Sequence, residues 1–244
     1  MNINIHRAHS RGITDLGWLN SRHTYSFSSY QNPERIKFGT LRVINDDAVQ
    51  PGMGFAMHSH ENMEIISIPL SGALQHKDSM GNHPVIQSGE VQIMSAGTGI
   101  SHSEYNHSTT ENVNFLQIWI LPKVLNIPPR YAQKRFDPEK RQNRFQLIVS
   151  PDCTQDSISI NQDAYFSLAE FDEERTINYS LHRQDNGVYI FVIAGAVTLG
   201  DICLNERDGA EIMDSPALEL RAQKGTHLLC MEIPLIPARS SSPN

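Results

Sequence analysis

Short segments with β-sheet patterning, separated by turn-forming clusters, constrain the fold of this chain more than any other feature. Seven segments alternate apolar and polar residues or are rich in β-branched residues: Phe38–Asn45, Glu64–Leu70, Val113–Leu121, Phe145–Val149, Val188–Ile193, Ala196–Leu199 and His227–Ile233. Turn-forming residues lie between them, for example at Ser71-Gly72, Ser79–Asn82, Asn186-Gly187 and Asp208-Gly209. Helical periodicity is scarce. Many short strands with this spacing predict an all-β fold, either a sandwich or a barrel.

The two halves of the chain carry a similar pattern. In the first half, Met63–His76 (MEIISIPLSGALQH) is followed by Ser88–Met94 (SGEVQIM), and in the second, Gly187–Gly200 (GVYIFVIAGAVTLG) is followed by Asp208–Met213 (DGAEIM). In each half a strand passes through a glycine turn into a second strand, and another glycine turn precedes a strand that ends in Ile-Met. A repeat of about 120 residues indicates two copies of one small β-domain.

A charged interval separates the halves. The segment Arg130–Asn143 follows Pro128-Pro129 and contains Pro138, and we interpret it as a helical or irregular linker. We therefore expect two domains, residues 1–128 and 129–244. The last residues, Ala238–Asn244, are expected to form a frayed tail.

Composition excludes several classes of protein. The 20 basic and 27 acidic residues give a net charge of −7, so no overall basic field exists to bind nucleic acid directly. The three cysteines, Cys153, Cys203 and Cys230, are too few and too scattered for a disulfide scaffold or a CxxC site. The first residues lack the apolar core of a secretory signal, and we expect a cytoplasmic protein with reduced thiols. The longest apolar stretch, Phe115–Pro122, is too short for a membrane span of about 20 residues.

Two pairs of potential metal ligands carry the chemistry of the first half. His58 and His60 are two residues apart, and so are His102 and Glu104. Residues at i and i+2 of a strand leave the same face, so each pair can point into one barrel interior. Three imidazoles and a carboxylate suit Fe(II), Mn, Co, Ni, Cu or Zn, and octahedral coordination would leave positions open for substrate or water.

The oxygen ligand has an alternative. Glu64 follows the second histidine by four residues and is a second candidate, but Glu104 is in phase with His102 and is favoured. Glu61 and His107 are out of phase with their neighbouring pairs and are expected to point away. His23 and His76 have no partnered spacing, and we interpret them as surface or hydrogen-bonded histidines.

Apolar residues near the pairs are candidates for a pocket lining. Phe55, Met57 and Met94 are close to the ligands in sequence, although parity along the strand directs Met57 away. The second half offers His182 alone near its corresponding hairpin, with no further histidine until His227. We therefore expect the second domain to lack metal ligands and to support the first.

The first half closely resembles the pirins, bicupin proteins that include bacterial quercetin 2,3-dioxygenases. The matching stretches cover nearly all of the first 120 residues: Gly17–Phe27 (GWLNSRHTYSF), Phe38–Asn45 (FGTLRVIN), Pro51–Ile65 (PGMGFAMHSHENMEI), His76–Asn82 (HKDSMGN), Met94–Asn106 (MSAGTGISHSEYN) and Leu116–Ile120 (LQIWI). The second half resembles the family only in length and general β pattern.

The resemblance implies two cupin barrels packed face to face, with one mononuclear metal ion in the N-terminal barrel. The family's ligands map onto His58, His60, His102 and Glu104, and Glu64 then has a structural role. Fe(II) is the ion that we expect first. The C-terminal barrel, residues 129–244, would hold no metal.

The resemblance also implies two different functions. In the preferred one, the chain is a dioxygenase that opens the central ring of quercetin or a related flavonol with O2, releasing carbon monoxide, with Glu104 as general base. In the alternative, the metal senses oxidation in a pirin-type regulatory protein that binds a protein partner. A sugar isomerase is disfavoured because no phosphate-binding cluster is present. We expect a monomer that acts without membrane or direct nucleic-acid contact.

Overall fold

The computed structural model of the chain describes residues 1–235, and it confirms the all-β fold class. The described part divides into two compact units. We call residues 12–136 together with 160–162 the first barrel, and residues 1–11, 137–159 and 163 onward the second barrel. The expected tail, Ala238–Asn244, lies outside the described residues.

The first barrel contains a seven-stranded sheet with the strand order β12-β9-β6-β11-β4-β3-β2 and a four-stranded sheet with the order β5-β10-β7-β8. The bounds of the seven strands are β12 (Arg130–Arg135), β9 (Glu90–Ser95), β6 (Glu64–Ser71), β11 (Val113–Ile120), β4 (Leu41–Val49), β3 (Leu19–His23) and β2 (Gly12–Asp15). The bounds of the four strands are β5 (Gly54–His60), β10 (Ile100–Asn106), β7 (Ala73–Asp78) and β8 (Val85–Gln87).

The second barrel repeats this plan. Its seven-stranded sheet has the order β1-β20-β17-β22-β15-β13-β14, and its four-stranded sheet has the order β16-β21-β18-β19. The bounds of the seven strands are β1 (Asn2–His6), β20 (Gly209–Met213), β17 (Asn186–Ala194), β22 (His227–Pro234), β15 (Tyr165–Glu170), β13 (Gln146–Ser150) and β14 (Ile158–Ser159). The bounds of the four strands are β16 (Arg175–Ser180), β21 (Ala217–Ala222), β18 (Ala196–Leu199) and β19 (Ile202–Asn205).

Helical structure in the described residues consists of short 3-10 turns: η1 (Ala8–Ser10), η2 (Pro138–Arg141) and η3 (Thr154–Asp156). No helix within residues 1–235 has the length and apolar character that crossing a membrane would require.

Each barrel is held together by apolar side chains that its two sheets direct toward each other. Alternation along the strands produces this arrangement, as in β21, where every second residue is buried. In the first barrel, Leu74 and Ile86 of the four-stranded sheet pack with Val113 and Phe115 of the seven-stranded sheet. In the second barrel, a larger cluster joins residues of both sheets in the same way.

The predicted repeat corresponds to equivalent strands. The first copy forms β6, β7 and β9, and the second forms β17, β18 and β20, at the same places in their sheets. Gly72 and Gly195 form the two hairpin turns with φ values of +73° and +74°, a left-handed conformation that glycine adopts without steric cost. The repeat therefore reflects one fold built twice.

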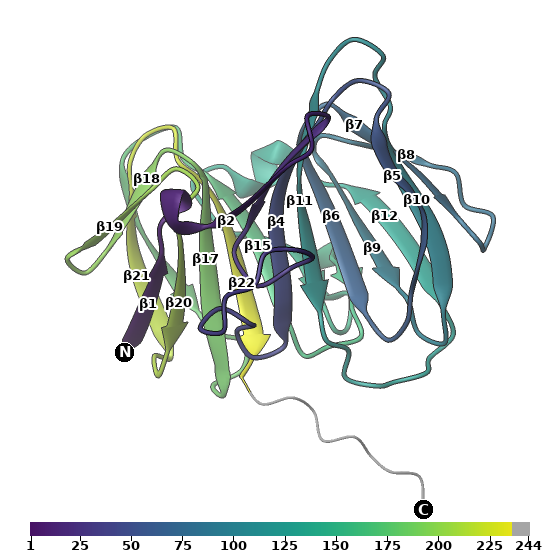
Figure 1. The fold of residues 1–244 in the computed structure, drawn as a ribbon. Helices are drawn as coiled ribbons and strands as arrows, with labels where there is room; N and C mark the ends of the chain where they lie inside the picture. The colour runs from purple at the N-terminus through teal and green to yellow at the C-terminus, as the bar shows by residue number, and fades with distance from the viewer. Residues whose placement is uncertain (236–244) are drawn as a thin grey trace, which may run out of the picture. The chain divides into compact units, whose positions relative to one another are not determined.

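The division between the barrels differs from the expected boundary after residue 128. The interval Arg130–Asn143 is not a linker throughout, because Arg130–Arg135 forms β12 and pairs with β9 in the first barrel. At the equivalent edge of the second barrel, β1 from the N-terminus pairs with β20 (Figure 1). Edge strands expose one side to solvent and tolerate charged residues, so their composition does not distinguish them from connections.

Candidate metal centre

The four-stranded sheet of the first barrel carries all four predicted ligands. His58 and His60 lie on β5, and His102 and Glu104 lie on the neighbouring strand β10. Strand pairing sets His102 opposite His58. The register shifts after this pair, so that Glu104 is opposite Phe55 and β5 has one extra residue. Such a β-bulge redirects side chains next to it and is frequent at functional sites.

Three of the four residues form one compact cluster, which we call the three-histidine cluster. The ring centroids of His58 and His102 are 4.5 Å apart, those of His58 and His60 are 4.8 Å apart, and those of His60 and His102 are 5.0 Å apart. One ring nitrogen from each residue lies within 4.8 Å of the other two. This spacing allows all three nitrogens to face a single ion.

The proton positions favour a metal ion. His58 Nδ1 lies 2.8 Å from the carbonyl oxygen of Ala56, and because a carbonyl oxygen only accepts, Nδ1 carries the proton. In the neutral form of this imidazole, the lone pair is then on Nε2. This arrangement, with one ring nitrogen donating to a backbone carbonyl, is how protein metal sites fix the tautomer of a histidine ligand.

Burial keeps the other two imidazoles neutral. Burial and the neighbouring histidines lower the pKa of His102 to about 3 and the pKa of His60 to about 4. His102 is 1% exposed, and neither of its ring nitrogens has a hydrogen-bond partner among residues 1–235. A buried polar group without a partner is costly, and a metal ion between these nitrogens would satisfy it. The cluster therefore fits a divalent transition metal ion.

Glu104 adjoins the cluster through His102. Its Oε1 accepts a hydrogen bond from the Ser67 hydroxyl at 3.1 Å, and its Oε2 accepts one from Gln117 Nε2 at 2.6 Å. Its carboxylate lies within 4.8 Å of ligand atoms of His102 and His76, but it does not belong to the compact group with His58 and His60. Glu104 is thus a neighbouring carboxylate of the cluster, held by two donors from the opposite sheet.

A third strand of the sheet adds His76, which was expected to be a surface or hydrogen-bonded histidine, and Asp78, which the sequence interpretation did not consider. His76 and Asp78 lie on β7, where pairing sets His76 opposite Glu104 and Asp78 opposite His102. His76 is fully buried, its ring lies 5.3 Å from that of His102, and its Nε2 donates to Asp78 Oδ2 at 3.1 Å. Burial alone would raise the pKa of Asp78, but hydrogen bonds from Asn82 and His76 hold it below its usual value. The i, i+2 rule would have found this pair had aspartate been included.

The alternative carboxylate lies outside both groups of ligand atoms found among residues 1–235. Glu64 Oε2 accepts hydrogen bonds from the Ser95 hydroxyl at 2.8 Å and from the backbone N–H of Asn161 at 3.2 Å. Burial raises the pKa of Glu64 despite these bonds. Its contacts are those of a structural residue at the end of β6.

The remaining candidates also have clear positions. Glu61 and His107 are exposed, as their phase predicts. His23 is buried and hydrogen-bonded, with Nδ1 2.8 Å from Asn45 Oδ1 and Nε2 2.8 Å from the Thr14 hydroxyl. In the second barrel, His182 Nδ1 lies 2.9 Å from Glu232 Oε2 and its ring stacks on Tyr165 at 4.2 Å.

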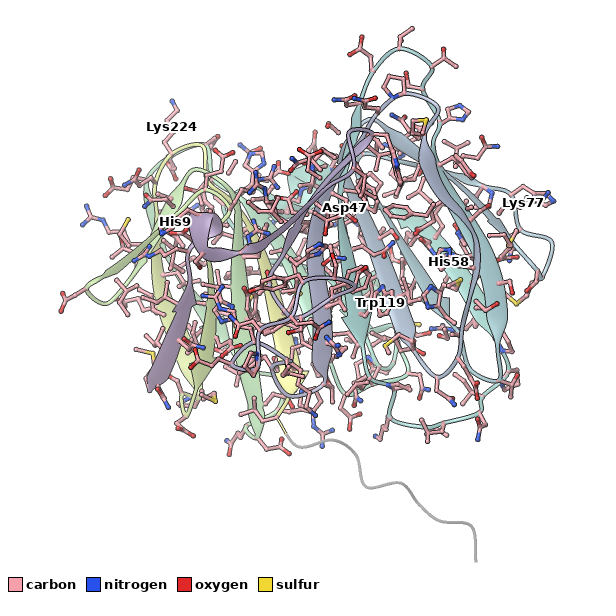
Figure 2. All side chains as sticks on the ribbon, viewed as in Figure 1. His9, Asp47, His58, Lys77, Trp119 and Lys224 are labelled. Carbon is pink, nitrogen blue, oxygen red and sulfur yellow. The ribbon has the colours of Figure 1, made fainter. Side chains whose placement is uncertain are left out.

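A cavity of about 440 Å³ opens beside the cluster. His58, His60 and Glu104 form part of its wall, together with Gln117 and Asp47. Figure 2 shows Asp47, His58 and Trp119 in the first barrel, whereas Lys77 extends outward from it. The cavity therefore combines ligand-type polar groups with other polar side chains from the seven-stranded sheet.

Aromatic side chains supply much of the remaining wall. Trp18 and Phe55 meet edge to face with ring centroids 5.6 Å apart, and Phe27 and Trp119 do so at 5.2 Å. Of the predicted lining residues, Phe55 lines the cavity, whereas Met57 is 53% exposed and Met94 is buried in a separate apolar cluster. The cavity suits a flat, largely apolar ligand with a polar group at the histidines.

The cysteines take no part in this site. Cys153 and Cys203 are exposed, Cys230 is buried, and all three are free thiols. Burial raises the pKa of Cys230 well above its usual value, so its thiol is protonated at neutral pH.

Comparison with known proteins gives the chain close relatives over its whole length. One family model, described as Pirin, matches residues 5–120, and another, described as Quercetinase C-terminal cupin domain, matches residues 147–233. The second match shows a relationship in the half for which the sequence interpretation found only a general β pattern. Quercetin 2,3-dioxygenase from Escherichia coli K12 is 40% identical over 233 residues, which are 95% of this chain and 99% of that protein.

Solved structures agree with this relationship. The crystal structure of YhhW from Escherichia coli is 39% identical with a TM-score of 0.92, covering 96% of this chain and 99% of that one. A crystal structure of bacterial pirin YhhW in complex with nickel(II), also from Escherichia coli, is 38% identical with a TM-score of 0.91, covering 96% and 100% of the two chains. These matches confirm the expectation of two cupin domains.

Proposed function

Because the chain belongs to the pirin family of two-cupin proteins, we propose that it is a metal-dependent dioxygenase that opens the central ring of quercetin or a related flavonol with O2. The observation that carries this proposal is the three-histidine cluster at the wall of an aromatic-lined cavity. The name of the 40% identical relative from Escherichia coli supports the reaction, and the nickel(II) complex of bacterial pirin YhhW supports a bound metal.

His58, His60 and His102 would hold the ion, with Glu104 as the fourth protein ligand. The low pKa values of His60 and His102 leave both imidazoles neutral, so that they can bind an ion without prior loss of a proton. In the neutral form of His58, the hydrogen bond from Nδ1 to Ala56 leaves the lone pair on Nε2. The donor set suits Fe(II), which we expect first, and it equally accepts Ni(II), Co(II), Mn(II), Cu(II) or Zn(II). When bound, such an ion supplies Lewis-acid chemistry that lowers the pKa of a substrate hydroxyl.

Glu104 would take the proton of that hydroxyl. Glu104 lines the cavity, and its carboxylate accepts hydrogen bonds from Ser67 and Gln117. Gln117 is in turn held by Trp119, whose Nε1 donates to Gln117 Oε1 at 3.3 Å. The side chains of β6 and β11 therefore orient the base toward the cavity rather than leave it free to rotate.

The aromatic walls would orient the substrate. A flavonol is flat and aromatic, and the pairs Trp18–Phe55 and Phe27–Trp119 offer ring faces and edges at the same cavity. Burial of the ring between them would also exclude water from the hydroxyl that faces Glu104. These residues thus bind and position the substrate while the histidines hold the metal.

The test is O2 uptake and carbon monoxide release with quercetin, after anaerobic loading with Fe(II) or Ni(II). We expect turnover in the wild type and a loss of about 100-fold or more in Glu104→Gln, in the range of general-base catalysis. Glu64→Gln is the matched control, because Glu64 is a buried glutamate outside the cluster, and it should retain turnover. Equal turnover in the wild type and Glu104→Gln would show that Glu104 is not the general base. Tight metal binding without turnover of any flavonol would overturn the dioxygenase and favour the regulatory alternative.

A further inference from the structure

Asp47 presents an unusual carboxyl group to the cavity. It lies on β4, is 2% exposed, and lines the cavity together with His58, His60 and Glu104. Its Oδ1 is buried and has no hydrogen-bond partner among residues 1–235. Buried polar atoms are almost always paired, so an orphaned carboxyl oxygen on a residue that lines a cavity needs an explanation.

The neighbours of Asp47 hold its side chain in place but leave one carboxyl oxygen without a hydrogen bond. Strand pairing sets Asp47 opposite Ser21 on β3 and opposite Phe115 on β11. A hydrogen bond with Ser21 favours the carboxylate, but burial outweighs it and raises the pKa of Asp47 to about 7. The group therefore stands at the cavity wall, fixed in position and able to form one more hydrogen bond.

The other residues that line the cavity indicate which kind of ligand could form a hydrogen bond with Asp47. The aromatic pairs Trp18–Phe55 and Phe27–Trp119 favour a flat aromatic body, and the three-histidine cluster together with Glu104 offers a site for one polar group of it. Asp47 comes from the seven-stranded sheet, whereas the cluster comes from the four-stranded sheet. A ligand that satisfies both must carry a second hydrogen-bond donor in addition to the group that faces the cluster, and on a flavonol that donor is a hydroxyl.

We infer that Asp47 is a specificity-determining residue that binds a second hydroxyl group of a polyhydroxylated aromatic substrate. This inference rests on the proposed function for the occupant of the cavity and adds which substrates it accepts. Aromatic compounds with a single hydroxyl would leave the Asp47 oxygen unpaired, and a site built to bind a hydroxyl discriminates strongly against the analogue that lacks it.

Binding can be measured without turnover because both tryptophans of the chain, Trp18 and Trp119, line this cavity. Quenching of tryptophan fluorescence would be recorded anaerobically on the Ni(II)-loaded protein. The two probes are quercetin and 3-hydroxyflavone, which lacks every hydroxyl group of quercetin except the 3-hydroxyl. We expect the wild type to bind quercetin about tenfold or more tightly than 3-hydroxyflavone.

Asp47→Ala should remove this preference by weakening quercetin binding while leaving the affinity for 3-hydroxyflavone within about twofold. Asp46→Ala is the matched control, since Asp46 is the adjacent aspartate on β4 and does not line the cavity; it should retain the preference. Equal affinities of the wild type for the two probes would overturn the inference without any variant. So would an unchanged preference in Asp47→Ala. Discrimination without O2 uptake would uphold the role of Asp47 and reject the dioxygenase, so the two failures are distinguishable.

Discussion

In the first barrel, β10 sets His102 opposite His58 on one side and opposite Asp78 on the other, whereas in the second barrel β21 sets Leu218 opposite Tyr179. The two four-stranded sheets have the same strand order. In the second barrel, Leu218, Leu220 and Leu199 belong to its apolar cluster. One fold therefore directs the same face of its short sheet either toward a polar site or toward an apolar core.

Two buried polar residues, one in each barrel, also differ in their hydrogen-bond partners. Glu232 of the second barrel is fully buried, yet it accepts hydrogen bonds from the Tyr179 hydroxyl, the Arg183 backbone and the Asn186 side chain, among others. His102 of the first barrel is as deeply buried and has no hydrogen-bond partner within the described part of the chain. An unpaired buried polar group costs stability unless a ligand pairs with it. We therefore interpret Glu232 as a residue that stabilises the second barrel and His102 as a residue that binds a ligand in the first.

The largest effect is expected when one inward-facing residue of each barrel is replaced by alanine. His102→Ala should weaken Ni(II) binding about 100-fold or more, since even the loss of residues that only support metal ligands costs 10–100-fold. Leu218→Ala in the second barrel should leave Ni(II) affinity unchanged and lower the free energy of unfolding by about 2–5 kcal/mol. Chelator competition and chemical denaturation measure the two quantities. A loss of metal affinity in Leu218→Ala would mean that the barrels do not divide these tasks.

Backbone packing gives a second comparison. A Cβ at Gly54 would collide with the carbonyl oxygen of Glu104 and with Tyr105 Cα, so Gly54→Ala must displace β5 from β10. A Cβ at Gly209 of the second barrel would collide with the Tyr189 side chain. Each substitution should destabilise its barrel by about 1–3 kcal/mol or more, measured by thermal denaturation.

Metal binding distinguishes these two glycine variants. Gly54→Ala should also weaken Ni(II) binding, because β5 carries His58 and His60. Gly209→Ala should leave Ni(II) binding unchanged, because Gly209 lies in the second barrel. Wild-type Ni(II) affinity in a destabilised Gly54→Ala protein would show that the strand pairing does not position the ligands.

The raised pKa of Asp47, the buried aspartate that lines the cavity of the first barrel, should make the stability of the protein depend on pH. Burial raises the pKa of Asp47 from 3.8 to about 7, so between these values the folded state holds a proton that the unfolded state releases. The free energy of unfolding of the metal-free protein should therefore fall as pH rises from about 4 to about 7. The fall is worth roughly 1.4 kcal/mol per pKa unit of the difference. In Asp47→Asn this contribution should vanish. Urea denaturation across this pH range measures the free energy of unfolding of both proteins. The same dependence on pH in the wild type and in Asp47→Asn would contradict the prediction.

The smallest effect is expected at the lone histidine of the second barrel. His182→Ala removes one donor from the buried Glu232 and should cost about 1–3 kcal/mol of stability. Ni(II) stoichiometry should stay unchanged, because His182 belongs to neither group of ligand atoms found in residues 1–235. A decrease in bound Ni(II), measured by elemental analysis, would place a ligand in the second barrel.

Local patterns predicted the strands well, and they predicted that each i, i+2 pair lies on one strand. The segment Val113–Leu121 was expected from its alternation and forms β11, Val113–Ile120, and the i, i+2 pairs lie on β5 and β10 as their spacing indicates. These features depend only on residues close together in sequence. Side-chain alternation along a strand is a local property, so it can be recognised without knowing the neighbouring strand.

Features that depend on pairing between distant strands escaped prediction. The edge strand β12 was interpreted as a linker because its charged residues obscure the β pattern, and β1 joins a sheet whose other strands begin some 140 residues later. His76 was set aside, although β7 pairs with β10 and brings it opposite Glu104. Asp47 gave no local signal, because the cavity wall forms only when both sheets of the first barrel are assembled.

The central claim is that the first barrel holds one metal ion at the three-histidine cluster. Anomalous diffraction from crystals soaked in Ni(II) tests it most directly, because the signal locates nickel without reference to activity. We expect one dominant peak within bonding distance of His58, His60 and His102, with Glu104 as the next protein donor. A dominant peak elsewhere in the chain, or none at saturating Ni(II), would contradict it.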